Sequence, residues 1–379
     1  VETLGDIDNL EAFYEYQLYS KSLHSSLKEM TIKIKEMTKK KDLKEYFQEM
    51  LENPIYKIKD DTDKYIFSID SQNTTEFDDA LHIRYDNELQ MTVVTVYVAQ
   101  VVFWLELFQL WNSFDNRIST IYLPDRRRPM LPTILTDSLC SLKEGERRFA
   151  IAIEFHIDSS YKIQNMHFYN ALIQIQKNYI YDEPKLIFQD RYYIHLFETT
   201  IQLDSHIKNS CELVSYWMVQ VNTYIAKYMI QYKTGIYRIG TIINKTQEKL
   251  EDQENERRNY NNLDTDIKRY IEYHVNAQSV LYKDDISLEH ELMNKKMYLR
   301  ITSAIRRYED ICNQRELMRL MGIPLRKGEK LQDFFQEEMC NDRYRSIRKV
   351  EAESEMIRRV LLNQEYYVYG VLCSRIPLI

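Results

Sequence analysis

Four carboxylates lie close together in the first quarter of the chain, between two apolar runs. The segment 65–83 reads YIFSIDSQNTTEFDDALHI and contains Asp70, Glu76, Asp78 and Asp79. Burying one ionised carboxylate is costly, and several close together repel one another. Magnesium would offset this cost, because it takes one or two carboxylates and fills its other positions with water and phosphate oxygens. Two such ions, about 4 Å apart, can stabilise both oxygens exchanged in phosphodiester hydrolysis. The cluster therefore predicts a metal site for a phosphate-rich substrate.

Two other interpretations of this acidic cluster have to be weighed. A calcium loop of the EF-hand type does not fit: counting from Asp70, its third, fifth, sixth and twelfth positions would be Gln72, Thr74, Thr75 and Leu81. On composition alone, a solvated acidic turn is the commoner case. The flanking apolar runs favour a site, but the four residues alone leave both interpretations open.

The elements that must position these carboxylates change in character along the chain. Residues 8–52 have apolar positions at helical spacing, and residues 65–175 carry several runs with period-two alternation. Residues 205–232 have an apolar stripe that predicts a long helix, and two further helices are expected at 264–282 and 302–322. We therefore expect an α+β fold with a strand-rich first half packed on a helical second half.

Composition restricts the classes of function. The chain has 379 residues, 44% of them hydrophobic, and a formal net charge of −7, which argues against a protein that coats nucleic acid nonspecifically. Local basic pairs and triplets recur, although each alone is most simply a solvated face. The seven glycines form neither GxGxxG nor GxxxxGK[ST], so a phosphate-cradling loop is not expected. We expect no signal peptide and no membrane span, and five scattered cysteines favour reduced thiols in the cytoplasm.

Three long motifs carry a family resemblance. They are IDSQNTTEFDDALHI at 69–83, TIYLPDRRRPMLPTILTDSLCSLKEGERRFA at 120–150 and YLRITSAIRRYEDICNQR at 298–315. In this order they resemble the ribonuclease II / ribonuclease R family, which includes the exosome's hydrolytic exonuclease subunit. The first resembles the family pattern Ile-Asp, five residues, Asp, one residue, Asp-Asp-Ala. His290 lies eight residues before Tyr298, where the family's His-Phe-Gly-Leu segment begins.

The resemblance implies an RNB-type catalytic domain that encloses an RNA channel. The implied activity is processive, magnesium-dependent 3′→5′ hydrolysis of single-stranded RNA to nucleoside 5′-monophosphates, with two Mg²⁺ ions and Mn²⁺ as a substitute. The implied catalytic residues are Asp78 and Arg306. The implied metal ligands are Asp70, Glu76, Asp78 and Asp79. The implied RNA-binding residues are Tyr122, Tyr181, Arg306, Arg307 and His290. A monomer is expected, and protein partners are not predicted.

The sequence also departs from the family pattern. Glu76 stands where the family has aspartate, and its extra methylene moves the carboxylate by more than about an ångström, a shift to which metal geometry is sensitive. Ala304 replaces the proline of Ser-Pro-Ile-Arg, and the glutamate expected on the long helix shortly before Asn222 is absent. These departures motivate an alternative: a catalytically impaired RNB relative that binds RNA or a protein partner.

The resemblance further implies three parts of the chain. Residues 1–55 are expected to be the end of a preceding cold-shock-type barrel followed by a helical linker. Residues 56–365 are expected to be the RNB exoribonuclease domain. Residues 366–379 are expected to be the first strand of a truncated C-terminal OB-type RNA-binding barrel.

Overall fold

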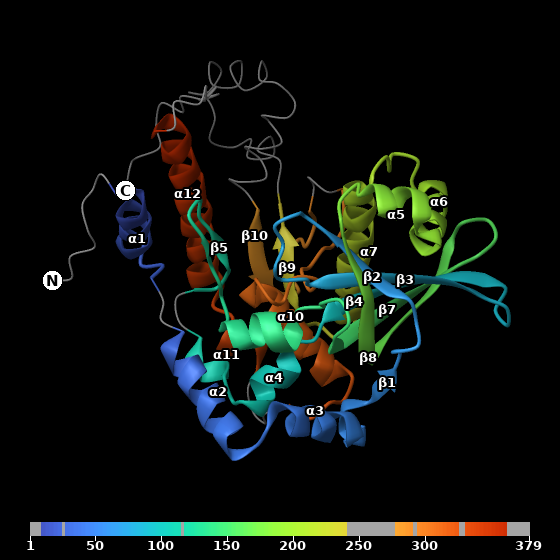
Figure 1. The fold of residues 1–379 in the computed structure, drawn as a ribbon, viewed down its shortest axis with the longest axis horizontal. Helices are drawn as coiled ribbons and strands as arrows, with labels where there is room; N and C mark the ends of the chain where they lie inside the picture. The colour runs from blue at the N-terminus through green and yellow to red at the C-terminus, as the bar shows by residue number, and fades with distance from the viewer. Residues whose placement is uncertain are drawn as a thin grey trace.

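The fold was analysed in a computed structural model (Figure 1). The structure describes residues 9–24, 27–114, 117–240, 277–290, 294–325 and 330–361. The expected barrel remnants at the two ends, residues 1–8 and 366–379, lie outside the described residues, so the three-part division stays a prediction.

Three helices precede the first strand. They are α1 (Leu10–Ser20), α2 (Lys28–Lys40) and α3 (Leu43–Glu52), which confirms the helical spacing seen at 8–52. Asn9 and Asp42 begin α1 and α3 by accepting hydrogen bonds from backbone amides of the first turn. α1 contacts the C-terminal helix α12 (Glu337–Leu361), so the two ends of the described chain pack together.

A six-stranded sheet forms the centre of the strand-rich half. Its strands, in chain order, are β1 (Ile58–Asp60), β2 (Ile66–Asp70), β3 (Asp79–Asp86), β4 (Met91–Ala99), β7 (Arg147–Ile157) and β8 (Ile163–Ile180). The spatial order is β1-β8-β2-β3-β4-β7, and β7 also pairs with β8, so five strands form a closed ring. Nearly every residue of β4 and β7 is buried, as expected for strands covered on both faces. The period-two runs therefore predicted these strands correctly.

The connection between β4 and β7 supplies one wall of the site. It contains α4 (Val102–Leu107), η2 (Trp111–Ser113), β5 (Ile121–Tyr122), β6 (Arg127–Arg128) and η3 (Ile134–Cys140). β5 and β6 pair with each other as a two-stranded antiparallel ribbon.

The second half is mainly helical, which confirms the α+β class. After β8 follow α5 (Pro184–Gln189), α6 (Arg191–Leu203), α7 (Ser210–Ile230), β9 (Ile236–Ile239), β10 (Gln278–Leu281), α10 (Tyr308–Leu320), α11 (Leu331–Phe334) and α12. α7 is the predicted long helix, and it packs against β2 and α6. Trp217 of α7 is fully buried, and its Nε1 donates a hydrogen bond to Thr200 Oγ1 at 3.1 Å.

Two helix predictions need correction. Residues 278–281 form strand β10 rather than a helix, because they pair with β9; residues 264–276 lie outside the described residues. Residues 302–307 form a loop, and α10 begins only at Tyr308. The loop is held by long-range bonds: the Ile305 amide donates to Asp78, and the Ser303 amide donates to Asp310. These side-chain bonds add to a local turn, in which the Arg306 and Arg307 amides donate to the Ser303 carbonyl oxygen at 3.2 and 3.0 Å.

Candidate active site

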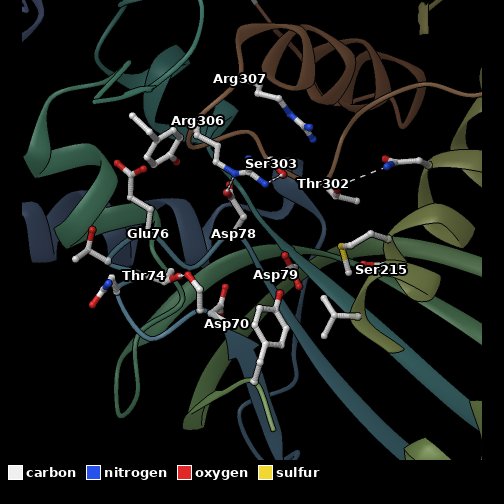
Figure 2. A pocket seen from close by; sticks show the side chains of 18 of the residues that line it. Asp70, Thr74, Glu76, Asp78, Asp79, Ser215, Thr302, Ser303, Arg306 and Arg307 are labelled. Atoms are coloured by element: carbon white, nitrogen blue, oxygen red, sulfur yellow. Dashed lines mark hydrogen bonds and ion pairs between the residues drawn. The ribbon is translucent and has the colours of Figure 1, made fainter. Parts of the chain in front are cut away.

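One cavity gathers the predicted site residues (Figure 2). It measures about 850 Å³ and lies where the C-terminal end of β2, the β2–β3 loop and the start of β3 meet α7 and the loop before α10. Eight of the nine predicted residues line it: Asp70, Glu76, Asp78, Asp79, Tyr122, Tyr181, Arg306 and Arg307. The structure therefore brings together residues from both halves of the fold.

Asp78 forms an ion pair with Arg306 in the wall of this cavity. Arg306 Nε donates to Asp78 Oδ2 at 3.0 Å, and the Ile305 amide donates to Oδ1 at 3.0 Å. Arg306 Nη2 also donates to Ser303 Oγ at 2.9 Å. Burial raises the pKa of Asp78, whereas Arg306 and the Ile305 amide oppose this rise. The pair therefore fixes the guanidinium of Arg306 at the edge of the cavity.

Asp70 and Asp79 carry charge that is poorly compensated. Burial raises the pKa of Asp70 to about 7; a hydrogen bond from Ser68 opposes this rise, and the nearby Asp78 adds to it. Burial, Asp70 and Asp78 raise the pKa of Asp79 well above its ordinary value. Asp70 Oδ2 is buried and has no hydrogen-bond partner among the described residues. Two adjacent carboxylates in this state favour a bound cation.

Glu76 is directed toward a different partner. Its Oε1 lies 2.7 Å from Arg127 Nη1, and the same guanidinium lies 3.1 Å from the carboxylate of Asp137. Neither oxygen of Glu76 has a hydrogen bond of good geometry within the described part of the chain. Burial raises the pKa of Glu76 to about 7, while Arg127 lowers it. Glu76 therefore ends on the Arg127 side of the cavity, and Figure 2 shows its side chain turned away from Asp70 and Asp79.

Two tyrosines line the cavity from different elements. Tyr122 ends β5 and is 50% exposed, and its backbone amide donates to Glu351 Oε1 of α12 at 2.8 Å. Burial raises the pKa of Tyr122 to about 12. Tyr181 follows β8 directly, and its amide donates to the Asp70 carbonyl oxygen at 2.9 Å. Both rings are placed to contact a ligand in the cavity, and stacking on RNA bases stays a prediction for each.

The remaining two predicted residues are placed differently. Arg307 lines the cavity, and its Nη2 donates to Asp310 Oδ1 at 2.8 Å. His290 does not line the cavity: it is buried beside Gly240 and packs edge-on against Tyr298, with ring centroids 5.8 Å apart. Burial lowers its pKa to about 4, so the ring is neutral near neutral pH. His290 can reach a ligand in the cavity only through Tyr298, which does line it.

Sequence reasoning missed several members of the site. Arg127 belongs to the basic triplet 126–128, which alone indicated a solvated face, yet it contacts Glu76. Asn222 of α7 donates to the Tyr298 hydroxyl at 2.9 Å, and both residues line the cavity. Glu351 of α12 accepts a hydrogen bond from the backbone amide of Tyr122, although the two residues are 229 positions apart in the sequence. No local pattern marks these residues, although the family motif at 120–150 contains Arg127.

The carboxylates of the cavity are the side chains that could bind a magnesium ion. Among the described residues, no three His, Cys, Asp or Glu side chains are arranged to hold a metal ion. Magnesium is commonly bound by only one or two carboxylates together with water and phosphate oxygens. Asp70 and Asp79 fit this requirement, since their oxygens are hard donors and Asp70 Oδ2 lacks a partner. Asp78 and Glu76, by contrast, are each paired with an arginine.

Part of the chain matches a known protein family. The family model described as RNB domain matches residues 58–193. This match confirms the resemblance to the ribonuclease II / ribonuclease R family that the sequence motifs indicated.

Individual relatives agree with this assignment. Exoribonuclease 2 of Psychromonas ingrahamii is 40% identical over 114 residues, which make up 28% of this chain and 16% of that protein. The apo form of Mycoplasma genitalium RNase R has a TM-score of 0.74 at 18% identity, and the match covers 96% of this chain and 66% of that one. The same protein in complex with ribose-methylated single-stranded RNA has a TM-score of 0.73. Yeast Ssd1, a pseudonuclease, has a TM-score of 0.63 at 17% identity over 78% of this chain and 44% of that one. The match spans less than a fifth of the length of the exoribonuclease 2 relatives.

Among the described residues, no helix combines the length and the apolar character needed to cross a membrane.

Proposed function

We propose that this chain is a magnesium-dependent 3′→5′ exoribonuclease that degrades single-stranded RNA processively to nucleoside 5′-monophosphates. One observation carries the proposal: Asp70, Asp78 and Asp79 share one cavity with Arg306. The arginine can bind a phosphate group, and the uncompensated carboxylates can bind a cation. Together they suit a substrate whose phosphates arrive with bound cations. The exoribonuclease names of the relatives support the same conclusion.

Metal binding, phosphate binding and positioning fall to different residues in this proposal. Asp70 and Asp79 would hold Mg²⁺, which when bound lowers the pKa of water and stabilises negative charge on phosphate oxygens. Arg306 binds the phosphate: its Nε and Nη2 are engaged by Asp78 and Ser303, whereas Nη1 has no hydrogen bond within the described residues. Asp78 positions this guanidinium. The planar fork of arginine suits such a contact with phosphate oxygens.

The tyrosines supply binding that does not depend on base sequence. Tyr122 would stack on the 3′-terminal base and Tyr181 on the RNA track, and stacking tolerates every base because each has a π-face. The Mycoplasma genitalium neighbour, solved with single-stranded RNA, supports RNA as the ligand. We place the protein in the cytoplasm, since buried Cys140, Cys312 and Cys340 are free thiols. A monomer stays a prediction from the sequence.

A second candidate is a catalytically silent RNA-binding relative. Glu76 pairs with Arg127 rather than with the other carboxylates, and no ready-made group of three metal ligands exists among the described residues. The pseudonuclease Ssd1 shows that this fold also occurs in a protein without nuclease activity. These observations favour a binding role if Glu76 prevents the metal site from forming.

Release of mononucleotides from a 3′-labelled RNA oligonucleotide separates the two functions. The full chain is incubated with RNA in Mg²⁺ and in EDTA, and with the matched DNA oligonucleotide. An exoribonuclease releases labelled 5′-monophosphate from RNA only when Mg²⁺ is present. Tight binding of RNA with no product in either buffer would support the silent relative and refute the enzyme.

A further inference from the structure

A second cavity lies outside the acidic site, between β3 and α6. It measures about 540 Å³ and is lined by residues of the segments 63–65, 82–85 and 191–195. Figure 1 shows α6 beside β3, and the two elements are in contact. The two cavities share no lining residue. Arg84 lies five residues beyond Asp79 on the same strand, which corresponds to about 17 Å.

Cationic side chains dominate the lining of this second cavity. The lining contains three cations, Lys64, Arg84 and Arg191, and one carboxylate, that of Asp63. Lys64 is committed to Asp61 at 2.9 Å, and Arg84 pairs with the carboxylate of Asp86. Arg191 is exposed and has no carboxylate partner among the residues that the structure describes. Arg191 is therefore the side chain best placed to bind an anionic group.

Flat surfaces lie next to these cations. The rings of Tyr65 and Tyr192 are stacked with centroids 4.4 Å apart and planes 12° apart, and the guanidinium of Arg191 lies 4.9 Å from the Tyr192 ring centroid. Tyr85 is 49% exposed on the cavity wall. Aromatic rings and arginine planes both stack on unpaired bases. The wall thus combines a site for a phosphate with a surface for a base.

A buried acceptor completes the lining. His82 is 5% exposed, and its Nδ1 lies 2.8 Å from the Tyr65 carbonyl oxygen, so Nδ1 carries the ring proton and donates it. Burial lowers the pKa of His82, which keeps the ring neutral. Its Nε2 is then a hydrogen-bond acceptor, and it has no partner within the described chain. An amino or hydroxyl group of a ligand would satisfy this atom.

We propose that this cavity binds a nucleoside 5′-phosphate unit, with the phosphate on Arg191, the base stacked on Tyr85 and a donor group of the nucleoside on His82. The unit comes either from a free nucleotide or from a segment of single-stranded RNA held outside the acidic cavity. The proposal does not depend on catalysis at the acidic site.

Photolabelling tests this site directly. The full chain is irradiated in EDTA with 8-azidoadenosine 5′-monophosphate or with an oligoadenylate that carries the same azido base, and adducts are located by mass spectrometry. We expect labelling within 82–85 or 191–195. It falls about tenfold or more in Arg191→Glu, because a hydrogen bond to a charged group contributes that much affinity. It falls by a similar factor in Tyr85→Ala, because the base loses its stacking surface. Melting curves confirm that each variant is folded.

Matched controls change a basic residue and a tyrosine elsewhere on the surface. Lys185→Glu reverses an exposed charge, and Tyr232→Ala removes an exposed ring; neither residue lines the cavity. Both controls should be labelled as strongly as the unchanged chain. If the mononucleotide labels the cavity more strongly than the oligonucleotide does, the ligand is a free nucleotide. If the oligonucleotide labels it more strongly, the ligand is an RNA strand. Adducts confined to the acidic cavity, or equal labelling of Arg191→Glu and Lys185→Glu, would overturn the proposal.

Discussion

The Asp78 carboxylate and the Arg306 guanidinium form an ion pair that joins residues 228 positions apart in the sequence. Arg306 Nε lies 3.0 Å from Asp78 Oδ2, and the carboxylate is almost fully buried, whereas 41% of the arginine side chain is exposed. Asp78 is therefore the fixed partner, and it orients an arginine whose Nη1 remains for a ligand. The role of Asp78 in this arrangement is to position Arg306 as much as to contribute negative charge.

Replacing Arg306 by lysine should impair turnover although the charge is retained. A lysine cannot bind Asp78, Ser303 and a phosphate oxygen with one planar group. We expect kcat/KM for mononucleotide release to fall about 10²-fold, the size typical of losing one oriented donor in an active site. The exposed Arg147→Lys serves as the control and should be unaffected. Equal activity of the two variants would show that only the charge of Arg306 matters.

Glu76→Asp should raise the rate of mononucleotide release. The shorter side chain cannot maintain the 2.7 Å contact with Arg127, so its carboxylate retracts toward the other acidic groups and Arg127 becomes available to the substrate. The initial rate is compared with that of the unchanged chain and of the exposed Glu88→Asp. A lower rate in Glu76→Asp would mean that the pair with Arg127 is part of the working site.

Tyr122→Ala should weaken RNA binding, whereas Tyr122→Phe should not. Stacking contributes about 1–3 kcal/mol per base, so the alanine variant should bind roughly 5–150-fold more weakly. The hydroxyl of Tyr122 makes no hydrogen bond within the described residues, so a phenyl ring should suffice. Fluorescence anisotropy with labelled RNA in EDTA measures both. Weaker binding by the phenylalanine variant would assign the contact to the hydroxyl instead.

Magnesium should stabilise the protein more at high pH than at low pH. The pKa of Asp70 is about 7 in the folded, metal-free protein, against 3.8 as its ordinary value. Between these values the folded state holds a proton that the unfolded state has lost, so metal-free stability falls as the pH rises toward 7. Mg²⁺ needs the ionised carboxylate, and its effect on the melting temperature should therefore grow from roughly pH 6 to roughly pH 8.

Asp70→Asn provides the comparison for this pH dependence. It removes one of the two proposed ligands, so the increment from Mg²⁺ should become small at every pH, although Asp79 still titrates. The exposed Asp285→Asn should behave like the unchanged chain. A Mg²⁺ increment in Asp70→Asn equal to that of Asp285→Asn would remove Asp70 from the metal site.

The sequence predicted what depends on local pattern and on long motifs. Runs rich in β-branched residues identified strands such as β4 and β7, although both strands are buried on both faces and their alternation is therefore incomplete. The motifs predicted that Asp78 and Arg306 belong to the same active site, and the structure places the two side chains in contact. Local patterns could not reveal that 302–307 is a loop, since the Ile305 and Ser303 amides donate to the side chains of Asp78 and Asp310.

Long-range polar pairing accounts for most of what the sequence did not reveal. The contact of Glu76 with Arg127 and that of Glu351 with the Tyr122 amide depend on which loops the fold brings together. The resemblance placed His290 at the RNA, whereas the structure buries it against Gly240, where even an added Cβ would approach its ring to 3.0 Å. Its predicted contact with RNA stays a prediction.

Mononucleotide release by Asp78→Asn, compared with Asp285→Asn, tests the central claim most directly. Asparagine still accepts the hydrogen bond from the Ile305 amide but loses the charge that holds Arg306, so the variant should fold and bind RNA. We expect melting and RNA binding close to those of Asp285→Asn, with release of 5′-monophosphate in Mg²⁺ reduced about 10²–10³-fold. Undiminished release by folded Asp78→Asn would contradict the assignment of this cavity as the active site.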